Sequence, residues 1–79
     1  MAREAIYMHK YGMTMTEGLI TEWHFQESDR VNEGAALLTV ETEKVDTDIE
    51  APVSGTLVDV RFAVDDEVPV GEIITDIEY

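Results

Sequence analysis

The chain has 79 residues, no cysteine and a formal net charge of −13. This length supports one small domain, residues 1–79, and the lack of cysteine excludes disulfides and thiolate metal sites. The negative charge would repel a phosphate backbone, which argues against a nucleic acid as partner. The apolar runs last only a few residues, so we expect no membrane span and a cytoplasmic location.

Six short segments place apolar residues at alternate positions, a pattern typical of β-strands with one face in water. These segments are 5–9, 18–25, 36–41, 45–50, 56–62 and 73–77. Polar or Gly- and Pro-containing stretches separate them, and no segment sustains the 3.6-residue period of a helix. The sequence therefore predicts an all-β domain.

The alternation also predicts which side chains face the core. In 45–50, Val45, Thr47 and Ile49 alternate with three acidic residues, which indicates one wet face. The other side chains assigned to inner faces are Thr21, Trp23, Phe25, Leu38, Val40, Val58, Val60 and Phe62.

An internal repeat relates roughly residues 18–42 to residues 55–79. A shift of 37 positions without a gap brings Gly18 onto Gly55 and Gly34 onto Gly71. One half alone cannot bury its apolar face, but two halves can cover each other. We therefore predict a flattened β-barrel or sandwich of two small antiparallel sheets related by quasi-two-fold symmetry.

The turn between 36–41 and 45–50 contains Lys44, one of only two lysines in the chain; the other is Lys10. A turn lysine is usually only a solvated side chain, but Lys44 is also suited to covalent modification, because its amine ends a long flexible stem. In the repeat, its counterpart falls just past the last residue, Tyr79. The symmetry therefore predicts that the Lys44 turn and Tyr79 lie at opposite ends of the domain.

Three stretches together resemble a known family. They are the loop from Met8 to Gly18, the turn Glu43-Lys44-Val45, and Ala51-Pro52-Val53-Ser54-Gly55. With these, nearly the whole chain resembles the lipoyl domain at the N-terminus of the acyltransferase components of 2-oxo acid and acetoin dehydrogenase complexes. One difference is His9, where many members of the family have proline.

The resemblance implies that Lys44, flanked by Glu43 and Val45, carries lipoate in an amide bond. It implies a carrier without catalytic residues, whose swinging arm passes acyl groups and reducing equivalents between active sites. The implied partners are a thiamine-diphosphate-dependent dehydrogenase component, dihydrolipoyl dehydrogenase, the acyltransferase core, and a lipoate ligase or lipoyl transferase. In a eukaryote, the implied location is the mitochondrial matrix.

Two alternatives remain: a biotinyl carrier and an unmodified interaction module. Biotin acceptors usually have methionine on both sides of the lysine, whereas Lys44 has Glu43 and Val45, so the resemblance favours lipoate. The loop 11–16 is either folded over the core edge or a partner-contacting lip close to the Lys44 turn. His9 and His24 lack metal-ligand spacing, so we assign no metal site.

Overall fold

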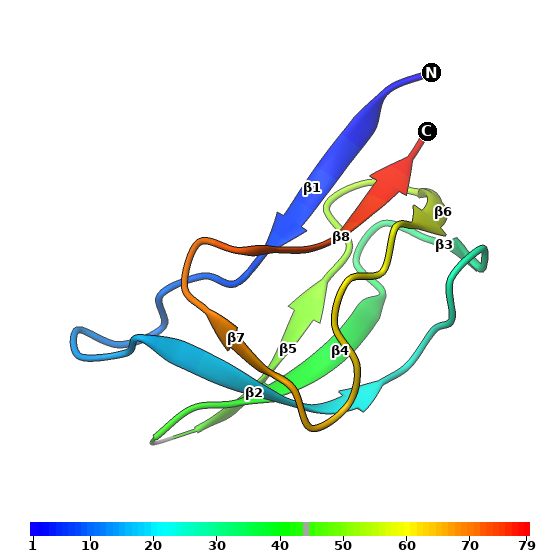
Figure 1. Ribbon diagram of the computed structural model, residues 1–79. Helices are drawn as coiled ribbons and strands as arrows, with labels where there is room; N and C mark the ends of the chain where they lie inside the picture. The colour runs from blue at the N-terminus through cyan, green and yellow to red at the C-terminus, as the bar shows by residue number, and fades with distance from the viewer. Residues whose placement is uncertain (44) are drawn as a thin grey trace.

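The computed structural model describes residues 1–43 and 45–79 (Figure 1). The predicted attachment residue, Lys44, lies outside the described residues. The strands are β1 (Arg3–Tyr7), β2 (Glu17–Trp23), β3 (Arg30–Val31), β4 (Ala36–Glu41), β5 (Asp46–Glu50), β6 (Gly55–Val58), β7 (Glu67–Pro69) and β8 (Ile73–Glu78). They form two four-stranded antiparallel sheets, β1-β8-β6-β3 and β5-β4-β2-β7, and none of the described residues is helical. The all-β, two-sheet prediction is confirmed.

A quasi-two-fold relation exchanges the two sheets. Replacing each strand by the one four places along the chain converts the order β1-β8-β6-β3 into β5-β4-β2-β7. Matching turns repeat the same hydrogen bond: the Gln26 amide donates to Asp29 Oδ2 at 2.8 Å, and the Ala63 amide donates to Asp66 Oδ2 at 2.8 Å. The symmetry therefore extends from the strand order to individual side chains.

The same turns tie the two halves together. The amide of Leu57 donates to the carbonyl of Asp29 at 2.9 Å, and the amide of Ile20 donates to the carbonyl of Asp66 at 3.0 Å. Leu57 and Ile20 are both fully buried. Each half thus supplies the turn that satisfies the backbone of the other half's central strand, so that neither half is complete alone.

The core lies between the sheets and is made almost entirely of aliphatic side chains. Its buried hydrophobic members are Ile6, Met8, Ile20, Val31, Leu37, Leu38, Val40, Ile49, Ala51, Leu57, Val68, Ile74 and Ile77. Trp23, Phe25, Val60 and Phe62 pack against this core as partly buried neighbours. Register shifts in β2 and β4 explain why Leu37 and Leu38, although adjacent, are both fully buried.

Several predicted strand limits and faces are wrong. The segment 5–9 is displaced to β1, because Arg3 pairs with Glu78 of β8 and the strand ends at Tyr7. The segment 56–62 is shortened to β6, since Asp59 adopts a φ of 52° and ends the strand; Leu57, not Val58, becomes its fully buried residue. Val45 precedes β5 and is 56% exposed instead of facing the core.

The short strands β3 and β7 are absent from the sequence-based prediction. Each has only two or three residues and follows a left-handed residue, Ser28 (φ 79°) or Asp65 (φ 76°). Their pairing partners, β6 and β2, are distant in sequence. A strand this short shows no alternation, so its existence depends on a neighbour that the local sequence does not reveal.

The two halves differ in one insertion. β4 and β8 begin 37 positions apart (36 and 73), whereas β1 and β5 begin 43 positions apart (3 and 46). The extra residues lie in the loop between β1 and β2, which has nine residues (8–16), whereas the corresponding loop between β5 and β6 has four (51–54). We call residues 8–16 the insert loop.

The chain termini and the β4–β5 turn are also symmetry-related. Ala2 and Tyr79 exchange backbone hydrogen bonds of 2.8 and 2.9 Å, and the equivalent bond closes the turn from Thr42 to Val45 at 2.9 Å. The molecule measures 36 by 20 by 19 Å. Figure 1 shows both termini at one end of the molecule, and the end of β4 with the start of β5 at the other.

The contact between β6 and β8 leaves no room for a side chain at Gly55. A Cβ atom there would lie 2.4 Å from the carbonyl oxygen of Glu78. We expect Gly55→Ala to lower the free energy of unfolding by about 1–3 kcal/mol, the usual cost of overpacking, in urea denaturation. Gly12→Ala is the matched control, because a Cβ at Gly12 meets nothing within 4 Å. Equal losses of unfolding free energy in Gly55→Ala and Gly12→Ala would contradict this account.

Candidate functional site

The turn between β4 and β5 is closed by Thr42 and Val45. The Thr42 amide donates to the Val45 carbonyl at 2.9 Å, and the Thr42 hydroxyl donates to the same oxygen at 2.9 Å. The Val45 amide lies 3.4 Å from the Thr42 hydroxyl oxygen. Backbone and side chain of Thr42 therefore both hold Val45, which gives the residues next to Lys44 a defined geometry.

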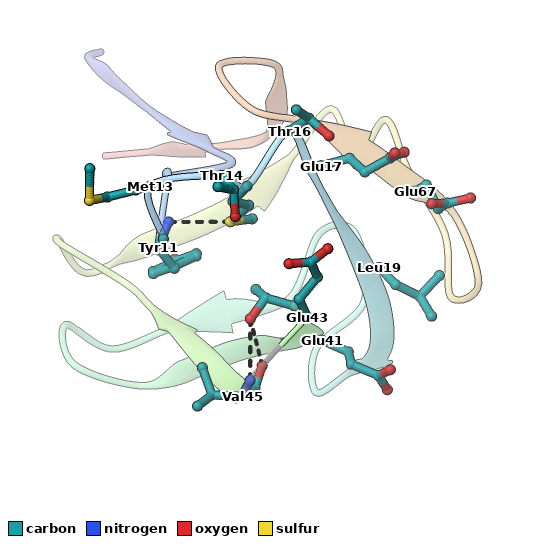
Figure 2. A pocket seen from close by; sticks show the side chains of 13 residues that line it. Tyr11, Met13, Thr14, Thr16, Glu17, Leu19, Glu41, Glu43, Val45 and Glu67 are labelled. Atoms are coloured by element: carbon teal, nitrogen blue, oxygen red, sulfur yellow. Dashed lines mark hydrogen bonds between the residues drawn. The ribbon is translucent and has the colours of Figure 1, made fainter.

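The insert loop lies across a cleft from this turn. The cleft has a volume of about 570 Å³. It is lined by Tyr11, Gly12, Met13, Thr14, Met15, Thr16, Glu17, Leu19, Glu41, Thr42, Glu43, Val45 and Glu67. Figure 2 shows Tyr11 of the insert loop on one side of the opening and Glu43 of the turn on the other. Loop 11–16 thus lies close to the turn, as the lip alternative expects, while Met15 of the same loop packs on the core, as the other alternative expects.

Short hydrogen-bonded contacts give the insert loop its shape. The Met15 amide donates to the Gly12 carbonyl at 3.1 Å, and the Tyr11 amide lies 3.2 Å from the Met15 sulfur. Met15 is partly buried and packs on the core. Burial also raises the pKa of the Tyr11 hydroxyl above its ordinary value. The loop is therefore a folded wall of the cleft, anchored by Met15.

The two sheets carry different charges at equivalent positions. Directly paired residues share one face of a sheet. Across one sheet the row reads Arg3, Glu78, Thr56 and Arg30, and across the other the equivalent row reads Asp46, Glu41, Leu19 and Glu67. Both arginines of the first row are replaced by acids in the second row, of which Glu41, Leu19 and Glu67 line the cleft.

The first sheet neutralises its acids internally. Arg3 forms ion pairs with Asp59, Asp76 and Glu78, and Arg61 lies 3.4 Å from Asp76. Asp76 is nearly buried, and the two guanidinium groups supply its counter-charge. Among the described residues of the second sheet, the ion pair is the 3.8 Å contact of His24 with Glu22, which exists only when the imidazole is protonated.

Two carboxyl groups meet on β2 and β7 at the edge of the cleft. A hydrogen bond and the negative charge of Glu67 together raise the pKa of Glu17 above its ordinary value. Sequence reasoning missed this pair, because β7 was not predicted. It also missed the capping role of Thr42, for which the local signal was a hydroxyl residue at the start of a tight turn.

Among the described residues, the remaining candidates do not assemble a second site. Nε2 of His24 lies 3.0 Å from the Thr39 hydroxyl, which donates to Asp48 at 2.7 Å, all on the exposed face of the second sheet. Among the described residues no group of three or more His, Cys, Asp or Glu side chains is arranged to hold a metal ion. Within the same residues there is no helix long and apolar enough to cross a membrane.

The fold is shared with two solved structures. The lipoyl domain of the 2-oxoglutarate dehydrogenase complex from Azotobacter vinelandii is similar with a TM-score of 0.82 and 20% identity, covering 95% of each chain. The Kluyveromyces lactis urea carboxylase is similar with a TM-score of 0.80 and 19% identity, covering 98% of this chain and 6% of that protein. At these identities the likeness defines a class of small two-sheet domain and nothing more.

The family follows from the sequence. The biotin/lipoyl family model, described as "Biotin-requiring enzyme", matches residues 4–77, and the chain belongs to this family. One relative is the dihydrolipoyllysine-residue acetyltransferase component of the acetoin cleaving system of Pseudomonas putida, 42% identical over 67 residues. Another is the dihydrolipoyllysine-residue acetyltransferase component of the pyruvate dehydrogenase complex of Corynebacterium glutamicum, 44% identical over 69 residues.

These relatives are much longer proteins. The matches cover 85% and 87% of this chain but only 18% and 10% of the relatives. The family model and these relatives confirm the family resemblance inferred from the sequence.

The pair of carboxyl groups at the cleft predicts a pH effect. Because the folded-state pKa of Glu17 is raised, ionised Glu17 opposes folding above that pKa, and the penalty disappears as the pH falls below the unfolded value. We expect Glu17→Gln to raise the melting temperature at pH 7 and to have little effect at pH 3.5. Glu50→Gln, whose cross-strand neighbour is Ala36, is the control. An equal rise in the melting temperature of Glu17→Gln at pH 7 and at pH 3.5 would contradict this cause.

The turn predicts a second effect. Thr42→Val removes the hydroxyl that bonds Val45 and should lower the free energy of unfolding by about 0.5–1.5 kcal/mol. It should also speed amide exchange at Thr42, because one of the two bonds that close the turn is lost. Thr42→Ser keeps the hydroxyl and should retain wild-type exchange. Identical exchange rates in wild type, Thr42→Val and Thr42→Ser would show that the side chain does not stabilise the turn.

Proposed function

We propose that the chain is a lipoyl carrier domain with lipoate attached to Lys44 through an amide bond. The observation that carries the proposal is the closed Thr42–Val45 turn, which lies at the end of the molecule opposite the termini and brackets Lys44 with Glu43 and Val45. Relatives at 42% and 44% identity are named as dihydrolipoyllysine-residue acetyltransferases, which supports lipoate as the attached group.

The residues around the turn fit such a group. Tyr11, Met15, Leu19 and Val45 offer apolar surface to an aliphatic chain, while the carboxylates of Glu41 and Glu43 remain in water. The bound group would supply a disulfide that accepts acyl groups and reducing equivalents. The chain's own residues hold the turn and orient the attachment point.

The charge distribution supports a role among several partners. Glu41 and Glu67 of the acidic row line the cleft, and Asp46 continues the row beside Glu41. A negatively charged surface steers a domain toward basic partner surfaces. We propose that these partners are a thiamine-diphosphate-dependent dehydrogenase component, dihydrolipoyl dehydrogenase and an acyltransferase core of a pyruvate or acetoin complex. Tethering would raise the local concentration of the arm at each active site.

A biotinyl carrier is the second candidate, because the matching family model is described as "Biotin-requiring enzyme". The neighbours of Lys44 argue against it, since Glu43 and Val45 stand where biotin acceptors usually have methionine. The fold does not separate the two functions. Enzymatic modification does, because each ligase attaches a group of different mass.

Intact mass spectrometry tests the proposal. The domain is incubated with ATP, lipoate and a lipoate ligase, and in parallel with biotin and a biotin ligase. We expect one lipoyl increment on wild type and on Lys10→Arg, and none on Lys44→Arg, because only Lys44 is carried by the turn. An increment on Lys44→Arg, or modification by the biotin ligase alone, would overturn the proposal.

A further inference from the structure

The cleft beside the turn gathers apolar side chains, of which Met15 also packs on the core. Tyr11 is 39% exposed and Val45 is 56% exposed, while Leu19 and Met15 are partly buried. Together they form the walls of one opening of about 570 Å³. Exposed apolar side chains scattered singly need no explanation, but a group gathered in one concave site is typical of a binding surface.

The insert loop that forms this opening has no equivalent at the other end of the domain. The loop between β5 and β6 is five residues shorter, and the other end is closed by the pairing of Ala2 with Tyr79. The other end of the quasi-symmetric frame therefore closes with a loop of only four residues. Because the insert loop is present only at the end that carries the β4–β5 turn, we connect its role with that turn.

The dimensions and chemistry of the cleft suit an aliphatic occupant. Its volume lies within the range of about 300–1,000 Å³ typical of small-molecule sites. A thioether and an aromatic ring, Met15 and Tyr11, offer favourable contacts to sulfur and to methylene groups. The carboxylates of Glu17, Glu41 and Glu67 are exposed and would disfavour an anion. A neutral chain ending in a disulfide ring satisfies both conditions.

Attachment at the turn would deliver such a chain to the cleft. Glu43 and Val45, the chain neighbours of Lys44, both line it. A group tethered between them loses little translational freedom on entering, whereas a separate partner would lose it in full. Weak apolar contacts are therefore enough to hold a tethered arm part of the time.

We propose that the lipoyl arm on Lys44 occupies this cleft between transfers, packed against Tyr11, Met15 and Val45. This inference rests on the proposed function. The arm exchanges between a docked state, in which the insert loop shields the disulfide ring, and a released state, in which it reaches a partner. The insert loop thus serves the arm of its own domain as a resting site.

The test uses the domain lipoylated by the ligase, with complete modification verified by intact mass. With methionine methyl groups labelled with carbon-13, we expect nuclear Overhauser contacts between arm methylene protons and the Met15 methyl. Met8 is fully buried in the core and provides an internal reference that should not respond to modification. Unmodified domain gives the baseline for both signals.

A variant pair gives an independent readout. Docking should slow reduction of the arm's disulfide by a soluble phosphine. Tyr11→Ser should accelerate that reduction about three- to tenfold, because it removes one partly buried aromatic contact. Tyr79→Ser, which alters an exposed tyrosine at the opposite end, should leave the rate unchanged. Urea denaturation of both variants verifies that the fold is retained.

The outcomes separate the two proposals. Arm contacts to Met15 together with faster reduction in Tyr11→Ser alone support the resting site. Complete lipoylation without arm contacts, and with equal reduction rates, overturns the resting site and leaves the carrier function standing. Met15 signals that shift only when a partner component is added assign the cleft to that partner and also overturn it. Failure of the ligase to modify Lys44 removes the carrier function and this inference together.

Discussion

Reciprocal docking of two turns is the interaction on which the rest of the structure depends. The carbonyl of Asp29 accepts a hydrogen bond from Leu57, and the carbonyl of Asp66 accepts one from Ile20. Both donors are fully buried, so each half-domain would leave an amide unpaired in the core without the other. A chain of this size buries a limited share of its surface, and exchanging turns makes one continuous core from two insufficient ones.

The same symmetry makes the departures from it informative. A strict repeat would give equal charges and equal loops at both ends. Instead, the insert loop is present at one end only, and the positions of Arg3 and Arg30 in one sheet are taken by Asp46 and Glu67 in the other. The strand order is equivalent in both sheets, so the strand frame itself accommodates both versions. They are concentrated where the β4–β5 turn and the cleft lie.

The sequence predicted the large features because they depend on patterns within one segment or between the two halves. The segment 36–41 coincides with β4, and Gly34 and Gly71 both adopt the left-handed φ values that their turns require. The sequence-based prediction failed where the deciding contact involves residues distant in sequence. The end of β6 at Asp59 and the pairing of β7 with β2 could not be predicted from local alternation. The position of the insert loop opposite the turn was anticipated, but the Glu17–Glu67 contact was not.

The placement of the termini bears on how a carrier can work. Ala2 pairs with Tyr79, so any chain continuing from either terminus leaves the same end of a molecule 36 Å long. The turn lies at the other end, where a tether would not obstruct it. Under the proposed function, the first sheet, which is nearer to neutrality through Arg3 and Arg61, would contribute little electrostatic steering. The acidic row on the second sheet would then turn that side of the domain toward a basic surface. In the proposed carrier, position and charge would act together: the frame separates the β4–β5 turn from the termini, and the unequal charges of the two sheets would favour approach of the acidic side to a basic surface.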